Sequence, residues 1–314
     1  MNESLGACVR DRAVLLRSIR KLLDSRGFLE VTPPCLMSEA IIDVYIDPLG
    51  LQQERLGTRY LQTSPELAMK RLLCDGAPSI YAICPAFRAN ESGQHHNTEF
   101  TLLEWYELGG TSRSAIDLLQ RLTVEMLQRA PCEVLTYQDA FADGLGVDPL
   151  ACDITVLRDL VSQEQPSLSQ GLITQRDDLL DVLLATRLQT EWSEKKRSVI
   201  LTRYPISQAA LAKPCADDPR CAERFEWFVD GIELANGYDE LVDAERLRSR
   251  FQSNAERRTL EGRDDLPMPA RFLAAIEKGL PPCSGVAVGV DRLLMVQRNQ
   301  DRLSDVMPLT DDAV

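Results

Sequence analysis

The 314-residue sequence predicts an α+β fold in which a mostly antiparallel β-sheet is flanked by helices. Apolar residues recur at helical spacing in several stretches, while other stretches are short, rich in β-branched and aromatic residues, and bounded by turn residues. Helices and strands do not alternate regularly, and several strands are joined by short polar connections. These features favour a mixed, mainly antiparallel sheet over a doubly wound parallel one.

The first predicted element is an amphipathic helix over residues 8–26. Its apolar side chains recur on one face, and arginine and lysine residues occupy the other. Gly27 follows where helices commonly end in a glycine with left-handed backbone. Residues 28–31 then predict a short strand, which Pro33 and Pro34 terminate.

A second strand and helix follow before the most polar part of the chain. Residues 59–62 predict the strand, and the helix continues to about residue 74. Thr63 or Ser64 is placed to cap this helix, with Pro65 at its first position.

The rest of the chain predicts further strands and helices around one sheet. In order, these are strands at about 79–88 and 98–107, helices at 112–130 and 176–192, strands at 198–204 and 223–235, a helix from Asp243 to about 258, and a strand–helix unit over 284–296. We interpret residues 1–314 as a single domain with an inserted helical subregion at about 111–195.

Composition narrows the possible functions. The formal net charge is −13, and an acidic surface repels phosphate backbones, so tRNA binding is not expected. Nine scattered cysteines without CxxC spacing predict free thiols in a reducing compartment. No stretch approaches the ~18 apolar residues of a membrane span, and the N-terminal residues do not resemble a signal peptide, so we expect a cytoplasmic location.

The first polar motif is the loop between the two strands predicted around residues 86–100. It carries Arg88, two histidines, acids and amides. An arginine fork pairs bidentately with carboxylate or phosphate, and Phe100 offers a face for a flat base. A solvated hairpin loop with one core phenylalanine explains the same residues equally well.

The second motif, residues 233–240, contains Asn-Gly, a strong hairpin signal. If Asn236 and Gly237 form a two-residue loop, Glu233 and Glu240 lie opposite each other, with Cβ atoms ~5 Å apart, where like charges repel. A cation would offset this repulsion, and Mg²⁺ binds carboxylates together with substrate phosphates. A solvated acidic turn is the alternative interpretation.

The third motif, residues 285–292, is a run of small residues that leads into a helix. Small residues let a ligand approach the backbone, and Arg292 in the first helical turn could reach a phosphate. A glycine-rich turn packed on the sheet is the alternative. Because the sequence contains neither a Walker loop nor GxGxxG, any ATP must be held by side chains.

In this order, the motifs resemble the signatures of class II aminoacyl-tRNA synthetases. Residues 27–33 resemble motif 1, which builds the dimer interface, residues 87–100 resemble motif 2, and residues 289–292 resemble motif 3. The resemblance covers nearly the whole chain and implies the catalytic-domain fold of that class. Within the class the lysine enzyme is most similar, through residues 63–67, 96–97, 99–101, 104–106 and 233–237.

One subgroup of this family matches better than the tRNA-charging enzymes. Lysyl-tRNA synthetases carry an N-terminal anticodon-binding domain that we do not find in this sequence. The chain resembles the stand-alone relatives that attach (R)-β-lysine to a lysine of translation elongation factor P. Ala287 stands where lysyl-tRNA synthetases usually have glycine, and its methyl group would narrow the amino-acid pocket.

The resemblance implies an AMP-forming ligase, a homodimer, that uses ATP and Mg²⁺ to make an acyl-adenylate and passes the acyl group to elongation factor P. The implied catalytic residues are Arg88 and Arg292, and the implied metal ligands are Glu233 and Glu240. The implied ATP-binding residues are Arg88, Ala89, Asn90, Asn97, Phe100, Glu233, Leu234, Gly289 and Arg292. The implied residues for β-lysine or lysine are Ser64, Pro65, Glu66, Glu104, Tyr106, Glu240 and Ala287.

Two departures from the family pattern concern motif 2. The family reads Arg-Asn-Glu where this chain reads Arg88-Ala89-Asn90-Glu91, which removes a side-chain contact at position 89, and Thr98 replaces a proline. Three alternatives stay open. They are a truncated synthetase paralogue with another acceptor, a non-catalytic regulatory paralogue, and an unrelated α+β protein.

Overall fold

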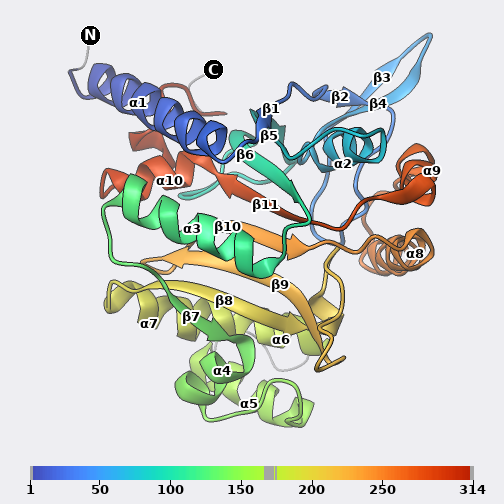
Figure 1. Cartoon of the computed structure of the whole chain (residues 1–314). Coiled ribbons are helices and arrows are strands. Elements are labelled where there is room, and N and C mark those ends of the chain that lie inside the picture. Colours follow the sequence, from blue (N-terminus) through green and yellow to red (C-terminus); the bar gives the residue numbers. More distant parts are fainter. Residues whose placement is uncertain (1–2, 166–172, 174, 312–314) are drawn as a thin grey trace.

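The computed structural model describes residues 3–165, 173 and 175–311, and a large mixed β-sheet forms its centre (Figure 1). Within these residues the sheet has eight strands in the order β1-β5-β6-β11-β10-β9-β8-β7. The edge pairs β1–β5 and β7–β8 are parallel, and the other neighbours are antiparallel, which confirms the predicted α+β fold. The strands are β1 (Leu29–Glu30), β5 (Ile80–Phe87), β6 (Glu99–Leu108), β7 (Glu133–Thr136), β8 (Ser198–Pro205), β9 (Cys221–Val229), β10 (Ile232–Asp239) and β11 (Cys283–Gly289).

Helices pack around this sheet in three groups, each with its own apolar core (Figure 1). The first group is α1, α3 and α10, the second is α2, α8 and α9, and the third, α4 to α7, packs on β7 and β8. The helices are α1 (Glu3–Ser25), α2 (Glu66–Cys74), α3 (Ser112–Leu127), α4 (Tyr137–Leu145), α5 (Ile154–Glu164), α6 (Arg176–Leu183), α7 (Gln189–Glu194), α8 (Ala244–Leu260), α9 (Ala270–Gly279) and α10 (Val290–Gln297).

A small second sheet extends away from the main one (Figure 1). Its strands are β2 (Leu36–Met37), β3 (Gly50–Gln53) and β4 (Gly57–Leu61), in the order β2-β4-β3. The strand predicted at 59–62 corresponds to β4, while its partner β3 was not predicted.

Side-chain alternation along the central strands divides the main sheet into an apolar and a polar face. On β6, Leu103 and Trp105 belong to the core under α1, α3 and α10, whereas Glu104 and Tyr106 line a cavity on the other side. The next strands repeat this pattern, because Val286 of β11 faces the apolar core. The residues of β9, β10 and β11 that line the cavity include Arg224, Glu226, Asn236, Tyr238, Gly285 and Ala287.

Most predicted helices occur where the sequence places them. Periodicity predicted α1, α3, α8 and α10 to within a few residues, and Asp243 caps α8 as expected by accepting a hydrogen bond from the backbone N–H of Arg246. The subregion between the helices predicted at 112–130 and 176–192 contains α4, α5 and β7, which were not predicted. No described helix combines the length and the apolar character that crossing a membrane requires.

Candidate active site

A cavity of about 640 Å³ opens on the polar side of the sheet. Its walls come from β6, β9, β10 and β11, from the first turns of α2 and α10, and from loops that include residues 41–46. Most of the residues singled out in the sequence line it: Ser64, Glu66, Arg88, Asn97, Phe100, Glu104, Tyr106, Glu233, Leu234, Glu240, Ala287, Gly289 and Arg292.

Three expected site residues do not line the cavity. Pro65 is buried just before α2, where its carbonyl accepts hydrogen bonds from the backbone N–H groups of Ala68 and Met69 in the first turn of the helix. Ala89 donates its backbone N–H to the carbonyl of Asp47, and Asn90 has an exposed side chain and a φ of 63°. Left-handed backbone is uncommon outside glycine, but asparagine tolerates it. The side chains of these residues are therefore not part of the cavity wall.

Arg88 follows β5 directly and has few fixed partners. Its guanidinium carbon lies 5.1 Å from the ring centroid of Phe100. Its Nε donates a long hydrogen bond of 3.5 Å to the carbonyl of Thr63, and the Glu91 carboxylate is 3.8 Å away. An arginine held this loosely remains free to bind a carboxylate or a phosphate.

Arg292 connects the three polar motifs. From the first turn of α10, its Nε donates to the carbonyl of His95 and its Nη1 donates to the carbonyl of Glu233, both at 3.0 Å. Its Nη2 lies 2.7 Å from Nε2 of His96, a residue that the sequence reasoning noted but did not assign to the site. Partial burial and the Arg292 charge lower the pKa of His96, which keeps the ring neutral and able to accept this bond.

Asp291 anchors the start of α10 so that Arg292 points into the cavity. Its Oδ2 accepts a hydrogen bond from the backbone N–H of Thr101 on β6 at 2.7 Å. Its Oδ1 lies 2.5 Å from Nη1 of Arg12 on α1. The Asp291 side chain thus ties α10 to β6 and α1.

Three buried glutamates line one part of the cavity and enclose a buried lysine. We call this cluster of Glu66, Glu104, Glu240 and Lys70 the acidic chamber. Lys70 Nζ pairs with Glu66 four residues earlier on α2, and it donates to Glu240 Oε2 at 2.6 Å. Glu104 instead accepts hydrogen bonds of 2.7 Å from the hydroxyls of Ser64 and Tyr106.

Burial shifts the ionisation of the acidic chamber. Burial and the nearby Glu66 raise the pKa of Glu104 to about 7. Burial also raises the pKa of Glu240 to about 8, although Lys70 opposes the shift. Burial tends to lower the pKa of Lys70, but Glu240 and Glu66 outweigh this effect and raise it, so its ammonium group stays charged.

The chamber depends on the absence of a side chain at Gly285. A Cβ at this position would lie 2.3 Å from Glu240 Oε1 and 2.4 Å from a ring carbon of Tyr106. Both contacts are far too short, so the glycine keeps the space open beside these two groups. Ala287, two residues further along β11, faces the same cavity.

The predicted hairpin at Asn236–Gly237 is wrong, and with it the geometric argument for a metal between Glu233 and Glu240. β10 runs unbroken through both residues, and the turn lies at Asp230–Gly231, where φ is 52° and 77°. At ~3.3 Å per residue, seven positions along one strand separate the two glutamates by roughly 20 Å.

The neighbouring strand offers a different carboxylate beside Glu233. Glu226 on β9 is buried and lines the cavity, where it pairs with Arg224 and accepts a hydrogen bond from the Tyr204 hydroxyl. Burial raises its pKa to about 7, with Arg224 opposing the shift and Glu233 contributing to it. Sequence reasoning missed Glu226, although the Asp-Gly dipeptide signals the turn that brings β9 back against β10. Within the described ranges, no three His, Cys, Asp or Glu residues are grouped to hold a metal ion by themselves. A cation here would need other ligands, such as phosphate oxygens.

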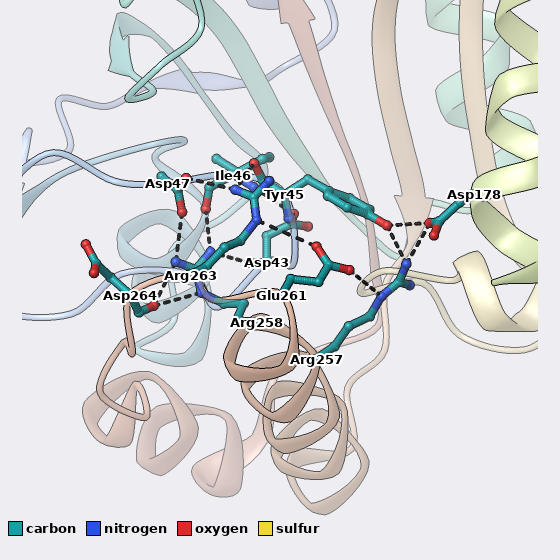
Figure 2. Close-up of polar contacts among 10 residues, drawn as sticks. All are labelled: Asp43, Tyr45, Ile46, Asp47, Asp178, Arg257, Arg258, Glu261, Arg263 and Asp264. Atoms are coloured by element: carbon teal, nitrogen blue, oxygen red, sulfur yellow. Dashed lines mark hydrogen bonds and ion pairs between the residues drawn. The ribbon is translucent and has the colours of Figure 1, made fainter. Parts of the chain in front are cut away.

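Three separate segments, the loop before β3, α6 and α8, meet on another side of the cavity, which we call the third wall (Figure 2). Tyr45 in the loop before β3 donates a hydrogen bond to Asp178 of α6, and Arg257 Nη2 of α8 reaches the same carboxylate at 2.6 Å. Arg258 donates hydrogen bonds to the same loop, to the Asp43 carbonyl at 2.9 Å and to the Asp47 carboxylate at 2.8 Å. The position of this loop therefore depends on the arginines at the end of α8.

Comparison with known proteins matches this site to one family. The family model of class II tRNA synthetases (D, K and N) matches residues 1–312. Elongation factor P--(R)-beta-lysine ligase of Pseudoalteromonas translucida (strain TAC 125) is 39% identical over 306 residues, which cover 96% of this chain and 94% of that protein. The ligase of the same name from Edwardsiella ictaluri (strain 93-146) is 40% identical over 308 residues, with the same coverage.

Proposed function

The chain belongs to the class II aminoacyl-tRNA synthetase family, and on that basis we propose that it activates (R)-β-lysine or lysine with ATP and transfers the acyl group to a lysine side chain of translation elongation factor P. It is an ATP-dependent ligase. One observation carries the proposal: a single cavity joins two arginines to the acidic chamber. The arginines suit a carboxylate and phosphates, and the chamber suits ammonium groups.

In the first step, a carboxylate oxygen of the amino acid attacks the α-phosphorus of ATP. A P–O bond forms, the bond to the leaving pyrophosphate breaks, and an acyl-adenylate results. Arg88 lines the cavity over the Phe100 ring and can neutralise charge on the reacting carboxylate and the α-phosphate, while Arg292 binds the outer phosphates. No enzyme nucleophile is needed, because catalysis rests on positioning and on charge stabilisation.

Mg²⁺ would supply further charge neutralisation on the phosphates when bound. We propose that Glu233 and Glu226 hold it, because both line the cavity from the paired strands β10 and β9 and the charge of Glu233 contributes to the raised pKa of Glu226. Glu240 is assigned to the amino acid instead, because it lies in the acidic chamber with Lys70.

In the second step, the acceptor amine attacks the acyl carbon and AMP leaves, which forms an amide. The third wall supports a cationic acceptor, because it presents Asp43, Asp177 and Asp181 to the cavity besides Asp178, which is paired with Arg257. These carboxylates attract an ammonium group and repel the phosphates of a tRNA end.

We further propose a cytoplasmic homodimer. Val9 and Val14 of α1 are 49% and 53% exposed, and Leu29 on the edge strand β1 is 56% exposed. Leu29 lies within residues 27–33, the segment that resembles motif 1, which builds the dimer interface in that family. The nine cysteines are free, which suits a reducing compartment. Sedimentation at micromolar concentration should give twice the chain mass of 35.2 kDa. A fully active monomer would contradict the dimer.

The function is tested by offering both acceptors. The enzyme is incubated with ATP, Mg²⁺ and (R)-β-lysine, together with either elongation factor P or lysine tRNA. Mass spectrometry should show the factor heavier by one lysyl unit on a single lysine, while the tRNA stays largely uncharged. Efficient tRNA charging with an unmodified factor would instead establish a truncated synthetase, and the absence of any amino-acid-dependent pyrophosphate exchange would indicate a non-catalytic paralogue.

A further inference from the structure

Lys70 is a buried cation that the proposed mechanism does not use. Only 1% of its side chain is exposed, and its ammonium group sits between Glu66 on its own helix and Glu240 at the end of β10. Breaking such a buried pair leaves an uncompensated charge, which is far more costly than losing a surface ion pair. The lysine therefore belongs to the charge balance of the acidic chamber.

A count of formal charges gives the net negative charge of the acidic chamber that a bound ligand can neutralise. When fully ionised, the chamber holds three carboxylates and one ammonium group, so two negative charges remain. Burial raises the pKa of Glu104 and of Glu240, which favours their protonated forms in the empty chamber. A ligand with two ammonium groups can displace these protons and neutralise the chamber, whereas a ligand with one cannot.

The geometry shows where these two charges are available. Glu104 accepts hydrogen bonds only from the neutral hydroxyls of Ser64 and Tyr106 among the described residues. Glu240 uses Oε2 for Lys70, and its buried Oε1 has no hydrogen-bond partner in the part of the chain that is described. The single positive charge of Lys70 thus balances one of the three negative charges. Glu104 and the Oε1 atom of Glu240 remain available to the ligand.

We propose that Lys70 is a specificity-determining residue that sets the net charge of the acidic chamber at two, so that the enzyme selects an amino acid carrying two ammonium groups over one carrying a single ammonium group. This inference rests on the proposed activation of an amino acid. It adds that selectivity follows from the number of buried charges and not from pocket shape alone.

Substitutions that change the number of charges test this proposal. Glu240→Gln leaves one net negative charge and should favour a monoamino acid, while Lys70→Met leaves three. The double variant Lys70→Met/Glu240→Gln again has two, since Glu66 is released from its pair. The measured quantity is the ratio of kcat/KM in ATP–pyrophosphate exchange for lysine over norleucine, or for β-lysine over 3-aminohexanoic acid.

We expect Glu240→Gln to lower this ratio at least tenfold, Lys70→Met not to lower it, and the double variant to return it to within about threefold of wild type. A purely structural lysine would reduce exchange with both substrates equally and leave the ratio of the double variant as low as that of Glu240→Gln, which would overturn the proposal. Thermal unfolding of each variant reports its folding separately.

Arg129→Met provides the matched control. It breaks an ion pair with Asp230 at 2.5 Å outside the cavity and should leave the ratio unchanged. If the wild-type enzyme catalyses pyrophosphate exchange with none of the amino acids tested, the proposed function itself is refuted. Wild-type exchange combined with an unrestored ratio in the double variant would refute only the role of Lys70.

Discussion

The guanidinium group of Arg292 lies 2.7 Å from the ring nitrogen Nε2 of His96, although the two residues are 196 positions apart in the chain. This contact attaches the loop between β5 and β6 to the first turn of α10. The Arg292 guanidinium also donates hydrogen bonds to the backbone carbonyls of His95 and Glu233. One side chain therefore connects α10, the loop between β5 and β6, and β10 at the proposed ATP site.

Arg292→Lys should therefore weaken ATP binding while retaining the positive charge. An ammonium group cannot reproduce the planar arrangement of donors that makes the three contacts. We expect the KM for ATP to rise at least tenfold, with the KM for the amino acid within about twofold of wild type, in pyrophosphate-exchange assays. An unchanged KM for ATP would show that the three contacts are dispensable.

The revised metal assignment predicts different effects for three glutamates. Glu233→Gln and Glu226→Gln should each raise the Mg²⁺ concentration required for half-maximal exchange, because each removes a charge beside the phosphates. Glu240→Gln should raise the KM for the amino acid and leave the Mg²⁺ titration unchanged. A shifted Mg²⁺ titration in Glu240→Gln alone would restore the original pairing inferred from the sequence.

Ala287→Gly should relax the choice between β-lysine and lysine. The alanine faces the cavity on β11, and one methyl or methylene group typically changes discrimination by ~1–3 kcal/mol, or ~10–200-fold. We expect wild type to prefer β-lysine and the variant to improve kcat/KM for lysine, measured by exchange with each amino acid. Equal kinetics in both proteins would remove Ala287 from the specificity determinants.

Amino-acid binding should release protons and strengthen as the pH rises from about 6 to 8. The pKa values of Glu104, about 7, and Glu240, about 8, are raised by burial, so both groups hold protons in the empty chamber at the lower pH. Ionisation at higher pH creates the charges that the ammonium groups need. Calorimetric titration in buffers of different ionisation enthalpy measures the release directly.

The sign of the accompanying stability change follows from the same shifts. An acid whose pKa is raised by folding binds more protons in the folded state than in the unfolded state, so the free energy of unfolding falls as the pH rises from about 4.5 to about 8. Glu104→Gln should remove the part of this dependence centred below pH 7. Thermal unfolding of the ligand-free protein across this range is the measurement, and a slope identical to wild type would contradict the assignment.

The sequence alone determined the type of fold, and most of the site residues that it singled out line the cavity. Alternation along residues 103–106 separates Leu103 and Trp105 from Glu104 and Tyr106, because successive side chains of a strand point to opposite faces. Helical periodicity and capping similarly placed α1 and α8, since both signals are local.

Only the tertiary structure decided how these residues pair. Asn236–Gly237 and Asp230–Gly231 are both strong turn signals, and local chemistry cannot choose between them. The structure turns at Asp230–Gly231, which allows β10 to continue between β9 and β11 in the middle of the sheet.

Lys70 illustrates the same limit in the acidic chamber. Its pairing with Glu66 is a local i,i+4 contact, but Glu240 lies 170 residues away and meets it only where α2 packs beside the end of β10. Residue type and spacing report how each segment folds. The charge of a buried chamber depends on which distant segments share it, because burial removes the water that would otherwise screen each group separately.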